Sequence, residues 1–534
     1  MPAIQSKLDT NSEAFQSNRK RMLELVAKLR GLEKRTREKS EEAKPLFDKR
    51  GQILPRERIA RLLDAGAPWL ELSSMAGYCL DNPDPEKTIP GGGMIAGIGY
   101  VAGVRAMVVA SDSGIDAGAI QHMGREKLLR AQGLALESKL PFVHLVESAG
   151  ANLLKYRVEG FIHGGAIFYN LAKLSAAGLP VVTVVHGSST AGGAYMPGLS
   201  DYVIMVRGRA KAFLAGPPLL KAATGEIATD EELGGAVMHT QVSGLGEYLA
   251  EDDSDGVRLA RDVLSRLDWK NSNLPGGKPP RYSAEELLGV MPADYRKPVD
   301  MREAIARFVD DSDFLDFKAD YGMATVCGHA AVQGHKVGII TNNGPLDPAG
   351  ATKATHFIQA CCQAGLPILY LQNTTGYIVG KASEEAGMIK HGSKMIQAVS
   401  NAGVPQLTLM CGASFGAGNY GMCGRGFNPR FLFSWPNAQT AVMGAEQAAL
   451  TMAIVMEGSM KRKGQAVDEE KIAALKKQIV DNFESQQSAL VTSARMLDDG
   501  IIDPRDTRNV LGFALSVCTE NRKVNPMQFG VARP

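Results

Sequence analysis

The sequence predicts an α/β protein in which one type of domain occurs twice. Two observations support this prediction. Short β-rich runs alternate with helical segments, and the order of these segments in the first half recurs in the second. Strands that alternate with helices are typical of layered α/β domains. A stretch rich in Pro, Gly and Lys, residues 271–299, indicates a linker. We therefore expect two domains, 1–275 and 276–534.

The repeat can be followed element by element. Arg56–Asp64 and Arg302–Asp310 are identical at six of nine positions and predict equivalent helices. Gly-Leu-Pro and Gly-Val-Pro tripeptides end later helices and begin buried strands. The matching segments, in order, are 97–112 with 328–343 (strand, turn, strand), 136–150 with 362–376 (helix, strand) and 172–195 with 396–420 (helix, strand, turn).

The composition excludes several classes of protein. The formal net charge is +2 and 45% of the residues are hydrophobic, unlike a disordered chain or a basic nucleic-acid-binding domain. Apolar runs such as Val181–Val185 are far shorter than the about 20 residues of a membrane span. The N-terminal segment has no apolar signal-peptide core, so we expect a cytoplasmic protein that binds neither membrane nor nucleic acid.

Familiar catalytic and metal-binding motifs are missing from the sequence. There is no GxxxxGK[ST] loop, no GxSxG and no HExxH. The seven cysteines form no CxxC pair and the nine histidines are scattered. The sequence thus predicts no metal site and no obvious side-chain nucleophile.

Glycine is abundant, at 58 of 534 residues against a usual share of about 7%, and two glycine turns stand out. They are Ser188–Tyr195 and Ser414–Tyr420, each after a predicted strand. A turn that opens a helix leaves backbone N–H groups unpaired, and small side chains let a ligand approach them. Paired N–H groups stabilise an oxygen that becomes negative in a transition state. Two turns therefore predict two oxyanions. Close packing of helix on strand is the alternative reason for glycine.

With these residues in view, the chain resembles the carboxyltransferase β subunit of biotin-dependent acyl-CoA carboxylases, over nearly its whole length. It is most similar to the methylcrotonyl-CoA and geranyl-CoA carboxylase branch. The strings that carry the resemblance are ESAGAN (147–152), GSSTAGGAYMPGLSD (187–201), FLAGPPLLKAATGE (213–226), LQNTTGYIVG (371–380), SFGAGNYGMCGR (414–425) and WPNAQTAVMGAEQAA (435–449).

The resemblance implies a fold, a cofactor and partners. It implies two tandem crotonase-like (ClpP/crotonase) domains from an internal duplication. The first, with an N-terminal helical arm, would face acyl-CoA, and the second would face carboxybiotin. Biotin would be carried by a partner α subunit with biotin carboxylase and biotin carboxyl carrier domains. A homohexamer core within an α6β6 complex is also implied, with active sites between the first half of one copy and the second half of another.

The resemblance also implies roles for single residues. The N–H groups of Ala417 and Gly418 would bind the ureido oxygen of carboxybiotin, and those of Gly192 and Gly193 the thioester oxygen as an enolate or dienolate. Further substrate contacts are expected at Gly150, Ala151, Gly164, Tyr195, Gly416 and Tyr420. The alternatives are an ordinary strand-to-helix turn at Gly150 and Ala151, and simple packing of the two tyrosines.

Two positions bear on the substrate. Gly164 lies near where methylcrotonyl-type subunits usually carry a bulky aromatic and geranyl-type subunits carry glycine, which favours geranyl-CoA. A plain loop glycine is the alternative. Asp116 stands where close relatives often have a lysine, and the missing positive charge would weaken anion binding. 3-Methylcrotonyl-CoA is the alternative substrate.

Other activities are also considered. Another acyl-CoA carboxylase or a biotin-dependent decarboxylase would share the fold. A crotonase-type hydratase or isomerase would need glutamates beside the thioester, and neither turn contains one. A non-catalytic scaffold subunit would tolerate bulky side chains in the turns.

Overall fold

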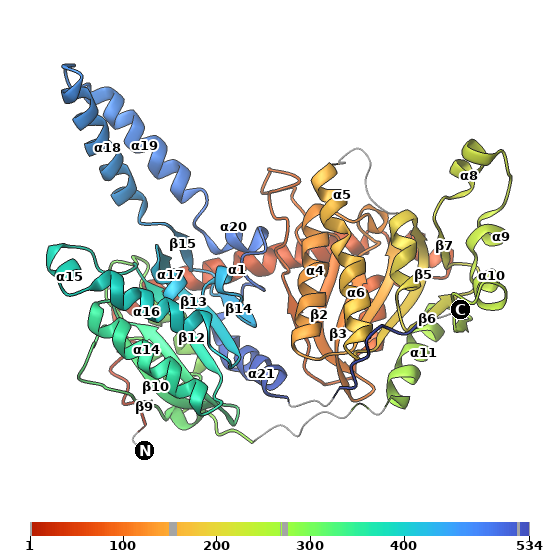
Figure 1. Cartoon of the computed structure of the whole chain (residues 1–534), viewed down its shortest axis with the longest axis horizontal. Coiled ribbons are helices and arrows are strands. Elements are labelled where there is room, and N and C mark those ends of the chain that lie inside the picture. Colours follow the sequence, from red (N-terminus) through yellow and green to blue (C-terminus); the bar gives the residue numbers. More distant parts are fainter. Residues whose placement is uncertain (1–2, 149–156, 268, 270–275, 521–523, 533–534) are drawn as a thin grey trace. The chain divides into compact units, whose positions relative to one another are not determined.

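The computed structural model describes residues 3–148, 157–267, 269, 276–520 and 524–532 (Figure 1). The chain forms two compact units. Unit 1 comprises Met1–Arg30, Leu274–Ser493 and Leu497–Thr519, and unit 2 comprises Gly31–Asn273, Ala494–Met496 and Glu520–Pro534. The predicted domains 1–275 and 276–534 are defined by the sequence repeat, not by contacts, and they stay a prediction. By contacts, the first thirty residues group with the second half.

Unit 2 is built on an eight-stranded sheet. β1–β2 and β2–β3 are antiparallel, and the later pairs are parallel. The path runs through β1 (Leu70–Leu72), β2 (Met94–Val101), β3 (Val104–Ser111), β4 (Phe142–Ser148), β5 (Val181–Thr190), β6 (Tyr202–Val206) and β8 (Tyr248–Ala250), while β7 (Lys211–Phe213) pairs with the end of β5.

Helices cover the sheet of unit 2 (Figure 1). α3 (Pro55–Leu62) and α11 (Asp253–Arg266) pack on it through a core that includes Leu62, Val184 and Val257. α4 packs on β2 and β3 and against α6. The helices that precede or follow the strands are α2 (Lys44–Arg50), α4 (His122–Glu137), α5 (Val158–Gly164), α6 (Ala166–Ala176), α7 (Tyr195–Gly198), α8 (Pro217–Thr224), α9 (Asp230–Gly234) and α10 (Ala236–Gln241).

Unit 1 contains a seven-stranded sheet. Its path runs through β9 (Leu315–Asp316), β10 (Thr325–Val332), β11 (His335–Asn342), β12 (Ile368–Thr374), β13 (Gln406–Phe415) and β14 (Phe431–Ser434), and β15 (Gln439–Ala441) pairs with the end of β13. α14 (Pro348–Gln363) and α16 (Met388–Ser400) supply buried residues such as Phe357 and Met395 to its core.

The remaining helices of the second half are α12 (Leu287–Val290), α13 (Arg302–Ile305), α15 (Lys381–Glu385), α17 (Gly418–Gly421), α18 (Ala445–Arg462), α19 (Glu469–Glu484), α20 (Ala489–Ala494) and α21 (Thr507–Thr519). α1 (Glu13–Glu41) contributes residues to both units.

The two sheets share their order and strand directions. Each begins with antiparallel strands and continues with parallel ones, and in each a short strand pairs with the last residues of the longest strand. Even the register shifts correspond, at Val146/Ser148 in one sheet and Gln372/Thr374 in the other. The prediction of a mixed α/β protein is confirmed. Among the described residues, no helix combines the length and apolarity needed to cross a membrane.

Candidate active site

Each glycine turn has a left-handed residue at the same place in the repeat. β5 leads through the short 3-10 helix Ala191–Ala194 into α7, and β13 leads through Gly416 and Ala417 into α17. Ala191 has φ 53° and Gly416 has φ 55°. A left-handed alanine costs about 1–2 kcal/mol, so this shape is imposed on the first turn at a price in stability. Sequence reasoning missed Ala191, although its match to Gly416 in the repeat was available as a signal.

Each turn presents two consecutive backbone N–H groups. Across the described part of the chain, the N–H groups of Gly192, Gly193, Ala417 and Gly418 have no hydrogen-bond acceptor. Gly193 and Gly418 are buried, whereas Gly192 and Ala417 are exposed. More than about 90% of buried backbone N–H groups are paired in folded proteins. The turns thus have the donor arrangement that an anionic oxygen requires.

Packing explains the glycine in one turn but not in the other. A Cβ at Gly418 would lie 2.9 Å from Gly376 Cα and 2.9 Å from Thr374 Cγ2, so the interior excludes a side chain there. Among the described residues, the nearest atom to a Cβ at Gly192 would be Phe168 Cζ at 3.7 Å, and at Gly193 it would be Ser189 Oγ at 3.5 Å. Both are ordinary contacts. Helix packing therefore does not account for the glycines of the first turn.

Side chains hold the first turn in place. Ser189 Oγ donates to the Gly193 carbonyl at 2.9 Å. Tyr195, which begins α7, packs edge-on against Phe168 of α6 with ring centroids 5.9 Å apart. Tyr195 nevertheless remains 50% exposed.

An amide network holds the second turn. Asn419 Nδ2 donates to Ser414 Oγ at 2.7 Å, and Ser414 Oγ donates to Gln372 Oε1. Gln372 Nε2 donates to the Met422 carbonyl at 2.7 Å. Tyr420 is 51% exposed, with its ring 5.8 Å from that of Phe427. These bonds tie the turn to β12 and β13 without any charged group.

A buried charge network lies behind the first turn. Arg58 of α3 donates through Nη1 to Glu147 Oε2 at 2.7 Å and through Nη2 to Asp253 Oδ2 at 2.8 Å. Asp253 also contacts His186 Nδ1 at 2.9 Å. Gln52 Nε2 donates to Glu147 Oε1 at 3.0 Å. The network joins the ends of β4 and β5, the strands from which the predicted acyl-CoA turns emerge.

Contacts among these buried side chains determine which of them are charged. Burial alone would raise the pKa of Glu147, but the Arg58 charge and hydrogen bonds from Arg58, Ser113 and Gln52 outweigh it and lower the pKa. Burial likewise opposes ionisation of Asp253, and its contacts with His186 and Arg58 lower its pKa. Burial lowers the pKa of His186. Two carboxylates and a neutral imidazole therefore surround one guanidinium.

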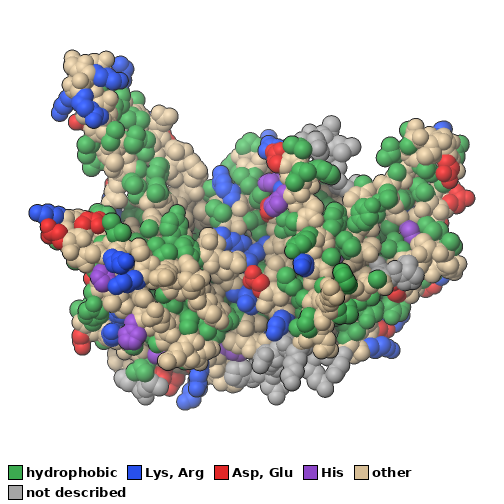
Figure 2. All heavy atoms as spheres, in the orientation of Figure 1, with side chains coloured by type: hydrophobic (Ala, Val, Ile, Leu, Met, Phe, Trp, Pro, Cys, Tyr) green, Lys and Arg blue, Asp and Glu red, His purple; other side chains and the backbone are tan. Residues whose placement is uncertain are grey.

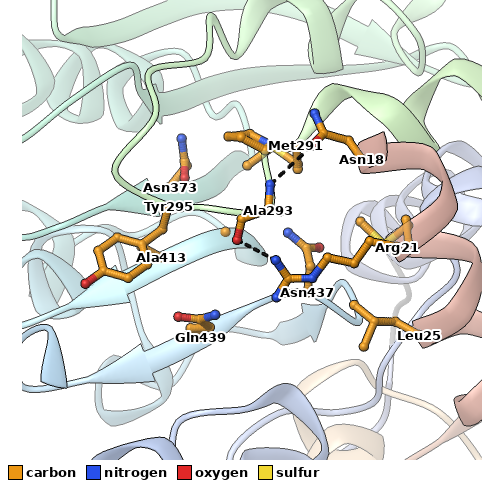
Figure 3. Close-up of a pocket in the computed structure, with 13 residues that line it drawn as sticks. Asn18, Arg21, Leu25, Met291, Ala293, Tyr295, Asn373, Ala413, Asn437 and Gln439 are labelled. Carbon is orange, nitrogen blue, oxygen red and sulfur yellow. Dashed lines mark hydrogen bonds between the residues drawn. The ribbon is translucent and has the colours of Figure 1, made fainter. Parts of the chain in front are cut away.

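A small cavity lies beside β13, next to the residues that lead into the second turn (Figure 3). Gly412 and Ala413 of β13 and Gln439 of β15 line it, and Tyr295 packs its ring 5.0 Å from Phe415. Its volume of about 20 Å³ suffices for one water molecule and for nothing as large as a ureido ring.

Metal ligands are not gathered at either turn. Among the described residues, no group of three or more His, Cys, Asp or Glu side chains is placed to hold a metal ion.

Comparison with known proteins decides the family. A model of the carboxyl transferase domain matches residues 48–530. The chain belongs to the carboxyl transferase family. The resemblance predicted from the sequence is confirmed, and the protein is an enzyme, a carboxyltransferase.

Relatives of this carboxyltransferase come from several organisms. A probable biotin-dependent acyl-coenzyme A carboxylase beta2 subunit of Mycobacterium tuberculosis is 48% identical over 488 residues, which is 91% of each chain. A probable mitochondrial methylcrotonoyl-CoA carboxylase beta chain of Drosophila melanogaster is 43% identical over 553 residues, covering 99% of this chain and 95% of the relative. The crystal structure of the P. aeruginosa geranyl-CoA carboxylase beta subunit matches with TM-score 0.93 and 55% identity, over 99% of this chain and 100% of that one.

The other predicted site residues of the carboxyltransferase lie as follows. Gly164 is the last residue of α5, and its missing Cβ would lie 3.8 Å from Arg125 Cδ. Asp116 is exposed and accepts a hydrogen bond from Gln121 Nε2 at 3.2 Å. Gly150 and Ala151 lie outside the described residues. The roles of all predicted site residues stay predictions.

Proposed function

We propose that this chain is the carboxyltransferase β subunit of a biotin-dependent acyl-CoA carboxylase. It moves CO2 from carboxybiotin on a partner subunit to a branched α,β-unsaturated acyl-CoA, with geranyl-CoA as the favoured substrate. The observation that carries the proposal is the pair of equivalent turns, each with two N–H groups that have no acceptor in the described chain. Two oxyanion sites fit a transfer between two carbonyl compounds.

The first turn would bind the acyl thioester. The N–H groups of Gly192 and Gly193 donate to the thioester oxygen and stabilise the negative charge that forms on it when a proton leaves the acyl chain. One such donor contributes about 2.7–4 kcal/mol of transition-state stabilisation. With an α,β-double bond, the charge reaches the γ carbon, and that carbon attacks CO2.

The second turn would bind the ureido oxygen of carboxybiotin. Carboxybiotin supplies the CO2 and, after its loss, a basic ring nitrogen. The N–H groups of Ala417 and Gly418 donate to the ureido oxygen, and the small side chains from Gly416 to Gly418 leave that approach open. Neither turn contains Asp, Glu or His, so a base supplied by the biotin ring would fill a role that the turns leave empty.

The substrate assignment rests on Gly164 and on overall likeness. A glycine at the end of α5 leaves room for a long chain, and the geranyl-CoA carboxylase beta subunit is 55% identical. 3-Methylcrotonyl-CoA is the second candidate, favoured by relatives such as the methylcrotonoyl-CoA carboxylase beta chain that is 43% identical over 99% of this chain.

The proposed assembly follows the family resemblance. We infer two crotonase-like domains from a duplication, which the matching sheets support, and a homohexamer core with biotin-carrying α subunits. Figure 2 shows apolar side chains along the α18–α19 hairpin, and Leu450, Met452, Ile454 and Val455 of α18 are exposed. Exposed apolar patches are common at protein–protein contacts.

The decisive experiment supplies the partner α subunit, ATP and bicarbonate with a panel of acyl-CoAs. Geranyl-CoA should be carboxylated with the highest kcat/KM. A preference for 3-methylcrotonyl-CoA would correct the substrate alone. Turnover without ATP or biotin would indicate a crotonase-type hydratase or isomerase, and release of CO2 from a carboxylated acyl-CoA as the main activity would indicate a decarboxylase.

A further inference from the structure

The longest strand of each sheet bends at an equivalent place, just before its glycine turn. Between two neighbouring pairs of β4 and β5, β4 has the single residue Glu147, whereas β5 has three residues, 186–188. Between two neighbouring pairs of β12 and β13, β12 has the single residue Asn373, whereas β13 has residues 411–413. Glu147 and Asn373 correspond in the sequence repeat. Extra residues on one strand bend that strand and change its twist.

At the bend, each long strand also changes its neighbour. β5 pairs with β6 up to Val185 and with β7 from Ser188 onwards. β13 pairs with β14 up to Met410 and with β15 from Ala413 onwards. In both halves, the paired N–H groups of the turn begin five residues after the middle of the bend. The bend therefore determines the direction in which each strand delivers its turn.

A glycine in the middle of each bend makes room for one side chain from the neighbouring strand. A Cβ on Gly187 would lie 2.6 Å from Glu147 Oε1. A Cβ on Gly412 would meet Asn373 Oδ1 and lie 3.3 Å from Asn373 Cγ. Neither glycine has a left-handed backbone, so the close approach of a side chain accounts for both glycines. The side chains of Glu147 and Asn373 thus fill the inside of the two bends.

The two filling side chains differ in charge. Glu147 is 8% exposed, and its two carboxylate oxygens accept hydrogen bonds from Arg58 Nη1 at 2.7 Å and from Gln52 Nε2 at 3.0 Å. Asn373 is neutral and borders the small cavity beside β13 (Figure 3). A buried carboxylate therefore fills one bend and an amide fills the other, so each bend can be changed without touching the other.

We propose that Glu147 and Asn373 are positioning residues for the two oxyanion turns. Glu147 fixes the bend that aims the N–H groups of Gly192 and Gly193, and Asn373 fixes the bend that aims the N–H group of Ala417 and its neighbour. This rests on the proposed function of the turns. A displacement of about 1 Å can lower a rate by about 10²-fold. Because the lost interaction belongs to the transition state, kcat should fall while KM changes little.

Substitutions at Glu147 separate side-chain length from charge. Glu147→Gln keeps the length and loses the charge, whereas Glu147→Asp keeps the charge beside Arg58 and is one methylene shorter. If Glu147 acts by filling the bend, kcat for geranyl-CoA in the holoenzyme should fall more in Glu147→Asp than in Glu147→Gln, and most in Glu147→Ala. A role in stability alone predicts the reverse order for Asp and Gln, because a buried guanidinium that loses its carboxylate is costly.

Two rates show which turn each residue serves. The partner α subunit is loaded with labelled carboxybiotin, and the label is followed after this chain is added with or without geranyl-CoA. Transfer to geranyl-CoA needs both turns, whereas release of CO2 without geranyl-CoA needs the second turn alone. Glu147→Ala should slow transfer about 10²-fold and leave release within about twofold. Asn373→Ala should slow both.

Matched controls remove a buried contact far from the turns. Glu520 pairs with Arg105 at 2.9 Å, with both side chains buried, and Arg105 lies at the start of β3, away from the strand ends that carry the turn. Glu520→Ala should lower the melting temperature without slowing transfer. Gln406, the first residue of β13, accepts a hydrogen bond from the Tyr370 hydroxyl at 2.8 Å. Gln406→Ala should leave both rates unchanged.

Crystal structures of the variants examine the bends without turnover. We expect the backbone at Gly192 to shift by about 1 Å in Glu147→Ala and Glu147→Asp, and to stay in place in Glu520→Ala. An unmoved turn, or release of CO2 slowed as much by Glu147→Ala as by Asn373→Ala, would overturn the positioning roles. A wild-type complex that neither releases CO2 nor transfers label would overturn the proposed function, and a shifted turn in the variants would still support the positioning roles.

Discussion

Replacing Gly192 with alanine tests whether this glycine is needed for ligand binding or for packing. Of the described atoms, the new Cβ would meet Phe168 Cζ alone, at 3.7 Å, and the backbone at Gly192 is not left-handed. Where alanine fits the native backbone, Gly→Ala stabilises a protein by about 0.4–1 kcal/mol. We therefore expect Gly192→Ala to keep or slightly raise the melting temperature.

Activity should respond in the opposite direction. The methyl group would stand beside the N–H groups that hold the thioester, and a displacement of about 1 Å can lower a reaction rate by about 10²-fold. We expect kcat/KM for geranyl-CoA in the holoenzyme to fall by about that factor.

Two further glycines serve as controls. Gly198 of α7 is exposed, and no described atom lies within 4 Å of its Cβ direction, so Gly198→Ala should leave activity unchanged and, like Gly192→Ala, keep or slightly raise the melting temperature. Gly418→Ala would force contacts of 2.9 Å on Gly376 and Thr374, and overpacking costs about 1–3 kcal/mol, so both properties should fall. Wild-type kcat/KM in Gly192→Ala would refute the oxyanion role of the first turn.

Three other substitutions have defined outcomes. Gly164→Phe should lower kcat/KM for geranyl-CoA more than for 3-methylcrotonyl-CoA, and equal losses in the panel assay would contradict a chain pocket. Arg58→Met leaves the carboxylates of Glu147 and Asp253 buried without their cation, and should cost about 3–5 kcal/mol of stability in a denaturant titration, so a smaller loss than 1 kcal/mol would count against the network. Burial raises the pKa of Asp498 from 3.8 to about 6, so its contribution to stability is present below about pH 4 and lost as pH rises to 6. Relative to the wild type, the free energy of unfolding of Asp498→Asn should therefore be higher by about 3 kcal/mol at pH 7 and unchanged at pH 4. Melting temperatures measured at both pH values test this.

The repeat made much of the fold predictable. Arg56–Asp64 matches Arg302–Asp310, and the later segments match in the same order. These matches correctly predicted two sheets, flanked by helices, whose strands correspond. The hydrophobic periodicity of α1 could not reveal which of the two hydrophobic cores its first residues pack against. Its first residues have the pattern of an amphipathic surface helix, and only tertiary contacts show that residues 1–30 group with the second half.

The candidate site was predictable where it depends on backbone, and not where it depends on distant side chains. Gly192, Gly193 and Gly418 stood out because small residues follow a strand. Ala191 did not, because alanine gives no sign of a left-handed conformation. The contact between Arg58 and Asp253 joins residues 195 positions apart, and no local pattern indicates such a pair.

A single-turnover transfer tests the central claim most directly. The partner α subunit is first loaded with labelled carboxybiotin and freed of ATP and bicarbonate, and this chain and geranyl-CoA are then added. We predict that the label moves into acid-stable carboxyl product only when this chain is present, and that Gly192→Ala slows the transfer. Label that stays on the α subunit, or leaves as CO2 equally fast with and without this chain, would contradict the account.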